Sequence, residues 1–252
     1  PYQLEHFERF YKKLTAQYPD VWTRKTLDTT PKGRSVPLLV SDIGAAKDIV
    51  LTCRHHCCES VASYVLEGVL EYVSQRRDAF AHYNFHVLPF VDLDGVEEGD
   101  QGKNRRPHDH NRDYIDEPIY SVTRKWTAYL KTLRPVADLD FHNPWLCSGN
   151  NDFSAIVMRP ERVESCERFS RMFARTTACR PDGLQHTAEH DAYPDVDWNV
   201  GVTTSACSYG VTLGAEYVFS LETPYFFKDK PLTIAALRDY GHDFAFTMSA
   251  IV

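Results

Sequence analysis

A short polar segment, residues 54–59, lies between an apolar run and an amphipathic stretch, and it constrains the fold more than any other part of the chain. The apolar run at residues 49–51 is typical of a buried strand. Residues 60–73 repeat valine at every fourth position, which predicts a helix that packs on a sheet. The polar segment therefore joins a strand to a helix. Its His56 and Glu59 can face one cleft, and imidazole and carboxylate are ligands that suit zinc.

Apolar runs and amphipathic stretches alternate along the rest of the chain. Strands are expected at residues 36–40, 49–53, 84–91, 136–141 and 217–221, and helices at residues 4–18, 60–73, 126–133 and 232–251. Polar segments at residues 92–114 and 180–201 are interpreted as loops. The alternation predicts an α/β fold with parallel strands, in which ligands bind beyond the carboxyl ends of the strands.

Length and composition narrow the class of protein. A chain of 252 residues with 43% hydrophobic content and no linker is expected to form one domain, residues 1–252. The net charge of -7 argues against a nucleic-acid partner, and no apolar stretch is long enough to cross a membrane. Seven irregularly spaced cysteines favour reduced thiols and a cytoplasmic location, although a removed signal peptide would leave no trace. The sequence does not indicate an oligomeric state.

A second H-x-x-E pattern competes with His56 and Glu59 as a zinc site. Residues 186–190 read His-Thr-Ala-Glu-His, the inverted zincin pattern, which requires both histidines on one face of a stable helix. The flanks contain Pro181, Gly183 and Pro194 and offer no apolar face. A long helix is therefore not expected here, and the segment is rejected as a metal site.

His142 is the best candidate for a third ligand. It ends the predicted strand at residues 136–141 and so lies at the same edge of the sheet as His56. Three protein ligands with water in the fourth position are typical of a catalytic zinc site. The alternative is that His142 is an ordinary polar residue at a loop entrance. His55 is interpreted as a neighbour, and Cys57 and Cys58 as small packing residues.

The chain resembles the zinc metallocarboxypeptidases in four blocks that follow the family's order. They are the H-x-x-E motif at residues 54–59, a loop at residues 94–112 that carries an arginine and then Asp-x-Asn-Arg, His142 after its strand, and a strand that ends at Glu222. The motif context is closest to the cytosolic and bacterial branches of the family. The resemblance implies an α/β/α sandwich around a mostly parallel mixed sheet.

The resemblance also implies a catalytic site. His56, Glu59 and His142 would hold one Zn²⁺ per chain, and Glu222 would be the general base that passes a proton to the departing amine. Asp109 would accept the spare ring N–H of His56 and so fix its tautomer.

The loop at residues 94–112 would supply the substrate contacts. Arg105 would stabilise the oxyanion, with Arg106 as the alternative. Asn111 and Arg112 would bind the terminal carboxylate of the substrate, for which a guanidinium group is suited.

These features predict a zinc carboxypeptidase that releases a C-terminal residue from a peptide or peptide-like substrate with a free carboxylate. The alternatives are an amidohydrolase of the aspartoacylase or desuccinylase type that cleaves small N-acyl amino acids, and an inactive binding module. Spacings shorter than in the digestive members indicate trimmed cleft loops. Three tyrosines are candidates to close over the substrate: Tyr193, Tyr209 and Tyr225. The preferred side chain stays open.

Overall fold

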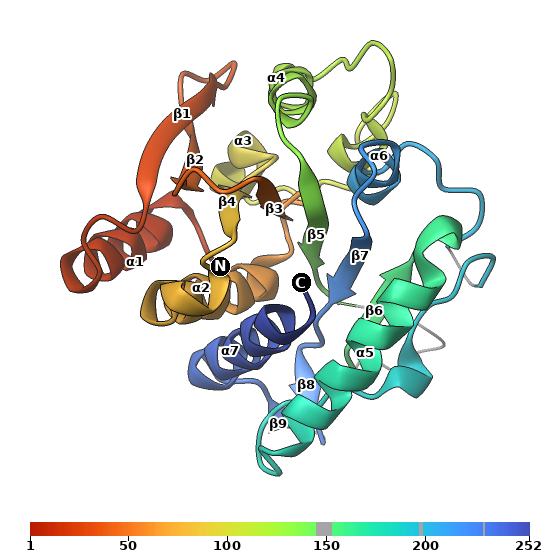
Figure 1. Cartoon of the computed structure of the whole chain (residues 1–252). Helices are drawn as coiled ribbons and strands as arrows, with labels where there is room; N and C mark the ends of the chain where they lie inside the picture. Colours follow the sequence, from red (N-terminus) through yellow and green to blue (C-terminus); the bar gives the residue numbers. More distant parts are fainter. Residues whose placement is uncertain (145–152, 197–198, 229) are drawn as a thin grey trace.

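A seven-stranded mixed sheet forms the centre of the protein (Figure 1). The computed structural model describes residues 1–144, 153–196, 199–228 and 230–252. The strands have the order β1-β2-β4-β3-β5-β7-β6, and the four strands β4, β3, β5 and β7 are parallel. Their bounds are β1 Thr23–Thr29, β2 Ser35–Ser41, β3 Lys47–Cys53, β4 Tyr83–Leu88, β5 Pro135–His142, β6 Ala155–Met158 and β7 Tyr217–Glu222. A small hairpin pairs β8 Phe226–Phe227 with β9 Lys230–Pro231.

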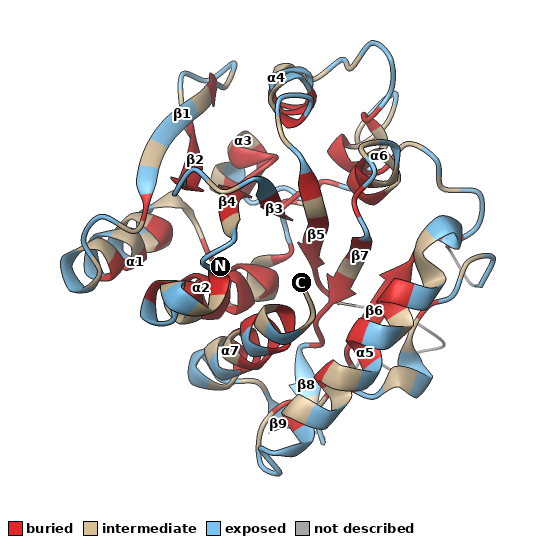
Figure 2. Ribbon diagram, in the orientation of Figure 1, coloured by how far each residue is buried: buried red, intermediate tan, exposed pale blue. Residues whose placement is uncertain are grey.

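Helices cover both faces of the sheet. In Figure 1, α1 Leu4–Gln17, α2 Ser60–Gln75, α5 Val163–Ala178 and α7 Ile234–Ile251 lie together on one side, and α4 Ser121–Leu130 and α6 Ala206–Thr212 lie on the other. A short helix, α3 Leu93–Glu98, follows β4. Buried residues gather on the central strands and on the inward sides of the covering helices (Figure 2). The predicted α/β/α sandwich is confirmed.

The alternation of side chains along β5 separates an apolar face from a polar one. Leu139 and Phe141 point to the side of α7, where Phe141 packs against Phe244 with ring centroids 5.2 Å apart. The intervening Asp138, Asp140 and His142 point to the opposite face, as the period of two requires. The polar face of β5 therefore leads directly to the carboxyl edge of the sheet.

Two glycines allow α2 and α7 to pack closely. A Cβ atom on Gly68 would lie 2.1 Å from the carbonyl oxygen of Arg238, and one on Gly241 would lie 2.1 Å from that of Val65. These distances exclude any side chain at either position, since the two backbones are in direct contact. This close packing against α7 fixes the position of α2, the helix that follows residues 54–59.

Several elements differ from the sequence predictions. The strand expected at residues 84–91 ends at Leu88, and the loop expected at residues 92–114 contains α3, which ends at Gly99 with a positive φ of 75°. β1, β6, α5 and α6 were not predicted. The strands β1 and β6 lie at the two edges of the sheet. Most residues of β1 are exposed or half-buried, and β6 has only four residues, so neither strand gives a clear apolar pattern in the sequence.

Candidate active site

Three adjacent parallel strands deliver the predicted ligands and base to one edge of the sheet. β3 ends just before residues 54–59, β5 ends at His142 and β7 ends at Glu222. In the ladder, Cys53 is opposite Phe141, and His142 is opposite Glu222. The parallel register therefore brings side chains that are far apart in the sequence to the same level along the strands, at the carboxyl edge of the sheet.

Arg54 holds the turn between β3 and α2. Its backbone is left-handed, with φ of 63°, and its side chain is buried. The guanidinium donates to the carbonyl oxygens of Cys57 (3.1 Å from Nε) and Tyr2 (2.9 Å) and to the hydroxyl of Ser63 (3.0 Å). These bonds tie the turn to the N-terminus and to α2, so the residues that follow Arg54 have a defined direction.

His56, Glu59 and His142 form one compact group. The Nδ1 atom of His56 lies 2.9 Å from one carboxylate oxygen of Glu59, and that of His142 lies 2.8 Å from the other. One ligand atom from each residue lies within 4.8 Å of the others. Two imidazole nitrogens that face a single carboxylate are a donor set typical of zinc, so these residues fit a metal ion.

A second carboxylate faces the other ring nitrogen, Nε2, of each histidine. Asp109 Oδ1 lies 3.7 Å from Nε2 of His56, and Asp140 Oδ2 lies 2.5 Å from Nε2 of His142. Such partners orient metal-binding histidines and leave the other ring nitrogen free for the metal. Asp140 was not identified from the sequence, although its spacing of two residues from His142 on a strand is the signal for a shared face.

The charges of this group favour a cation at its centre. Burial lowers the pKa of His142, but the carboxylates of Asp140 and Glu59 together outweigh that effect and hold the pKa above its usual range. Burial raises the pKa of Glu59, and the two histidines reverse this and keep it ionised. A divalent cation can supply the same positive charge.

His55 belongs to a neighbouring group, as its interpretation from the sequence implied. Its Nδ1 lies 2.9 Å from Asp140 and its Nε2 lies 2.7 Å from the hydroxyl of Tyr114. His55, Asp140 and His142 also lie close enough to one another to hold a metal ion. His56 and His142 line a cleft and His55 does not, so the group around Glu59 is the better site for a reaction with a substrate.

Glu222 is a buried carboxylate that lies opposite His142 in the ladder. Its Oε2 atom has no hydrogen-bond partner among the described residues, and the side chain is almost inaccessible. Burial raises the pKa of Glu222 to about 7. A carboxyl group with a pKa near neutrality can both accept and release a proton, which is what a general base requires.

A narrow cleft of about 40 Å³ opens beside these residues. Its wall is formed by His56, Asn111, Arg112, His142, Val157, Arg159, Val202, Ser205, Ser220 and Glu222. Asn111 is fixed there, because its Oδ1 accepts from the amide of Ala206 at 3.0 Å and its Nδ2 lies 3.3 Å from Nε2 of His142. Both residues predicted to bind a terminal carboxylate, Asn111 and Arg112, therefore lie in the cleft.

Arg105 does not lie with them. Its Nε donates to Asp92 at 2.8 Å and its terminal nitrogen to Asp100 at 3.2 Å, and it is not among the described residues that line the cleft. The cation that reaches the metal-binding group is Lys103, whose Nζ lies 2.9 Å from Oε1 of Glu59. Arg106 is exposed. Sequence reasoning missed Lys103 because an arginine was expected at this point of the loop.

Comparison with known proteins decides the family. The sequence model of the family described as "Zinc carboxypeptidase" matches residues 7–141, more than half of the chain. The chain belongs to this family. The match includes His56, Glu59 and Arg112 and ends one residue before His142.

One curated relative is similar over part of the chain. The Caenorhabditis elegans protein "Cytosolic carboxypeptidase 6" is 28% identical over 145 residues, which make up 51% of this chain and 32% of that protein. The chain thus spans about a third of the length of this curated relative.

Solved structures show the same fold. A metallo-carboxypeptidase from Burkholderia cenocepacia has a TM-score of 0.78 at 18% identity, with 99% of this chain and 69% of that chain covered. A metallo-carboxypeptidase from Pseudomonas aeruginosa, in complex with (2-guanidinoethylmercapto)succinic acid, has a TM-score of 0.78 at 19% identity and the same coverage.

The three candidate tyrosines of this zinc carboxypeptidase chain lie in different surroundings. The Tyr193 hydroxyl donates to Glu167 at 2.7 Å on the outer surface, and Tyr209 on α6 faces the carbonyl oxygen of Thr127. Tyr225 follows Glu222 by three residues, and burial and the charges of Cys58 and Glu59 raise its pKa. Tyr225 is therefore the one of the three that lies beside the metal-binding group.

His186, from the rejected zincin pattern, lies in a buried polar network. Its Nδ1 lies 3.2 Å from Ser154 Oγ and its Nε2 lies 2.9 Å from Ser170 Oγ. The segment contains only a 3₁₀ turn, Ala188–His190, so the expectation of no long helix is confirmed. Burial lowers the pKa of His186 to about 3, which keeps the ring neutral.

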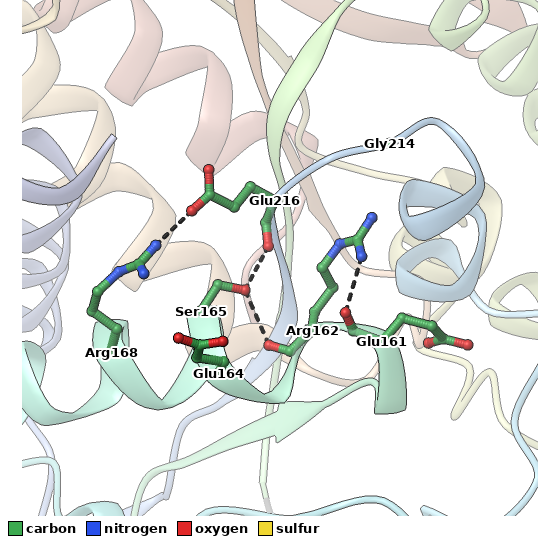
Figure 3. Close-up of a pocket in the computed structure, with 7 residues that line it drawn as sticks. All are labelled: Glu161, Arg162, Glu164, Ser165, Arg168, Gly214 and Glu216. Carbon is green, nitrogen blue, oxygen red and sulfur yellow. Dashed lines mark hydrogen bonds and ion pairs between the residues drawn. The ribbon is translucent and has the colours of Figure 1, made fainter.

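A larger hollow of about 350 Å³ lies elsewhere, between the start of α5 and the start of β7 (Figure 3). Two of its charged groups pair with each other, and Arg162 donates to the backbone carbonyl oxygens of Ala215 and Glu161. Arg168 pairs with Glu216 at 2.5 Å, and the Ser165 hydroxyl donates to the carbonyl oxygen of Glu216 at 2.7 Å. None of the residues predicted from the sequence to belong to the metal site or the substrate site lines this hollow. Among the described residues, no helix has the length and apolar character that a bilayer crossing requires.

Proposed function

We propose that this chain is a zinc-dependent carboxypeptidase that hydrolyses the C-terminal amide bond of a peptide or peptide-like substrate. One observation carries the proposal: the Nδ1 atoms of His56 and His142 face the two oxygens of Glu59, beside Glu222, whose Oε2 has no hydrogen-bond partner among the described residues. His56, Glu59 and His142 would hold one Zn²⁺. When bound, the ion supplies a Lewis acid and lowers the pKa of a water molecule toward neutrality.

Glu222 acts as the general base. Its buried Oε2 has no partner within the described chain, so it is free to take a proton from the attacking water and to deliver it to the departing amine. Asp109 and Asp140 keep the two histidine rings in one orientation from behind.

Asn111 and Arg112 bind the terminal carboxylate of the substrate. Both line the cleft, and the backbone carbonyl of Asn111 accepts from Arg112 at 2.9 Å, which orients the guanidinium. A fork of N–H donors can pair with both oxygens of a carboxylate. A pair of residues that binds a terminal carboxylate favours cleavage at chain ends over cleavage within a chain.

The oxyanion needs a cation close to the bond that is cleaved. The sequence resemblance assigned this role to Arg105, but its guanidinium is engaged by Asp92 and Asp100. Lys103 lies nearer to the reacting groups, because its Nζ is 2.9 Å from Oε1 of Glu59 and its charge acts to lower the pKa of Glu222. We therefore assign the stabilising charge to Lys103 and give Arg105 the role of holding the loop.

A cytoplasmic location and a single catalytic domain, residues 1–252, are parts of the same proposal. Support comes from the free thiols of the six cysteines in the described residues and from the continuous seven-stranded sheet. Cys147 lies outside the described residues.

The decisive experiment measures metal content and product release together. The purified protein is loaded with zinc, and three substrates are compared: a peptide with a free C-terminus, the same peptide with a C-terminal amide, and N-acetylaspartate. We expect about one zinc per chain and release of the terminal residue from the free peptide alone. Cleavage of N-acetylaspartate without cleavage of the peptide would favour the amidohydrolase. No cleavage of any of them by the zinc-loaded protein would favour a binding module.

A further inference from the structure

A chain of buried hydrogen bonds runs from Tyr114 to the proposed metal ligand His142. The Tyr114 hydroxyl lies 2.7 Å from Nε2 of His55, and Nδ1 of His55 lies 2.9 Å from Oδ1 of Asp140. The other oxygen of Asp140, Oδ2, lies 2.5 Å from Nε2 of His142. Each of the four side chains is buried. The proposed mechanism gives no role to Tyr114 or His55.

The donors and acceptors along this chain allow one direction of donation. The carboxylate of Asp140 only accepts, so both rings that face it must present an N–H group, at Nδ1 of His55 and at Nε2 of His142. The neutral ring of His55 then has its lone pair on Nε2, which accepts from the Tyr114 hydroxyl. In the same way, a neutral His142 ring has its lone pair on Nδ1, the nitrogen that faces Glu59.

Asp140 depends on His55 for its orientation. Its Oδ1 accepts from His55 and, at 2.9 Å, from the hydroxyl of Thr52 on β3, which leaves Oδ2 for His142. Loss of one of these donors would leave a buried oxygen short of partners, and the carboxylate could then turn toward the donors that remain. The rings of His55 and His142 are also nearly parallel, with planes 12° apart and centroids 5.9 Å apart. Polar and packing contacts therefore hold the same pair.

The first residue of the chain is itself fixed in position. The backbone amide of Tyr114 donates to the carbonyl oxygen of Thr204 at 3.1 Å. Its ring lies beside that of Tyr209 on α6, with centroids 5.9 Å apart. The hydroxyl therefore has a defined direction toward His55.

We propose that Tyr114 and His55 are positioning residues of the metal site. They hold Asp140 with one oxygen toward His142, and so fix the tautomer of His142 that presents Nδ1 to a zinc ion. The inference rests on the zinc site of the proposed function and extends it to two residues that do not line the cleft.

The test compares two tyrosines that contact a histidine in the same way. Tyr114→Phe removes the hydroxyl that faces His55. The matched control, Tyr129→Phe, removes a hydroxyl that lies 2.8 Å from Nδ1 of His86, whose Nε2 lies 3.1 Å from Asp48. Zinc dissociation constants are measured by competition with a chelator. We expect Tyr114→Phe to bind one zinc per chain about tenfold more weakly than the wild type, and Tyr129→Phe to bind zinc as the wild type does.

Two further measurements separate positioning from a general loss of stability. If Tyr114 acts through His55, then His55→Gln should weaken zinc binding by a similar factor, and the double variant should be no weaker than the weaker single variant. Nitrogen-15 NMR of the histidine rings in the zinc-loaded wild type should show His55 protonated at Nδ1 and not at Nε2.

The outcomes distinguish this inference from the proposed function. Equal zinc affinity of Tyr114→Phe and the wild type, or a proton on Nε2 of His55, would overturn the positioning role and leave the proposed reaction untouched. Effects of Tyr114→Phe and His55→Gln that add in the double variant would also overturn it. If the expected zinc affinities are found but no peptide is cleaved, the proposed reaction fails and the positioning role stands. A wild type that binds no zinc would overturn both.

Discussion

His142 and Glu222 are direct neighbours across the parallel ladder that joins β5 to β7. Each is the last residue of its strand, so both side chains emerge at the carboxyl edge of the sheet. The proposed metal ligand and the proposed base are thus positioned by the same backbone hydrogen bonds. A change of one residue in the register would move one of them to the opposite face.

Replacement of Glu222 by Gln should abolish hydrolysis and leave the metal bound. The amide has the same shape as the carboxylate but cannot take a proton, so we expect kcat to fall by about 10²–10⁴. Metal analysis and peptide turnover, measured on the same sample, test this. Glu216→Gln is the matched control, because Glu216 lies just before the same strand and is exposed. Full activity of Glu222→Gln would refute the base assignment.

Two neighbouring histidines should respond differently to substitution. His56→Ala removes a proposed ligand and should lower zinc affinity, whereas His55→Gln removes only a partner of Asp140 and Tyr114. We expect one zinc per chain in His55→Gln and much less than one in His56→Ala after dialysis against a weak chelator. The opposite result would move the metal to the group formed by His55, Asp140 and His142.

Lys103 and Arg105 can be separated by the kind of defect that each variant shows. Lys103→Met should lower kcat by about 10²–10³ with little change in melting temperature, because it removes the charge beside the reacting group. Arg105→Met should mainly lower stability, since it leaves Asp92 without its partner. Steady-state kinetics and thermal melts provide both readouts. A large fall in kcat only for Arg105→Met would return the oxyanion role to Arg105.

Asp138 should make stability depend on pH. It is 2% exposed, its Oδ2 has no partner among the described residues, and burial raises its pKa well above the usual range. The folded protein therefore holds this proton more tightly than the unfolded chain does. Its contribution to stability is present below the unfolded pKa and is lost as the pH rises, by about 1.4 kcal/mol per pH unit until the folded pKa is reached.

Asp138→Asn should remove this dependence, because the amide does not ionise. Urea unfolding of wild type and variant between pH 4 and pH 8 measures the difference in the free energy of unfolding. We expect that difference to shift in favour of the variant as the pH rises. A difference that does not change with pH would mean that Asp138 ionises equally in both states.

Gly241→Ala should destabilise the protein, although alanine is more favourable than glycine within a helix by about 1 kcal/mol. The new Cβ would meet the carbonyl oxygen of Val65 in α2, and backbone atoms in a packed core can yield little. Overpacking of this kind costs about 1–3 kcal/mol or more, so the net effect on the free energy of unfolding is unfavourable. Ser249→Ala, in the last turn of α7, serves as the control and should change little. A variant as stable as the wild type would mean that the two helices can separate.

Much of the sheet edge that carries the candidate site could be predicted from the sequence, because strands and helices have local periods. The apolar runs before His56, His142 and Glu222 identify three strand ends, and parallel strands bring such ends together. The short pattern of β6 and the polar stretch that contains α3 gave no comparable signal, because contacts with the rest of the protein decide those elements.

The sequence by itself determined the α/β fold and the group of His56, Glu59, His142 and Glu222, since regular elements translate spacing into direction. Only the tertiary structure decided which cations lie beside the metal-binding group and which line the cleft. Lys103 and Arg105 are two residues apart in an irregular loop, and Asp92 and Asp100 draw Arg105 away while Glu59 draws Lys103 in. Arg159 lines the cleft and is held by bonds to Asn199 and Val202, about forty residues further along the chain. Such long-range contacts have no counterpart in local sequence.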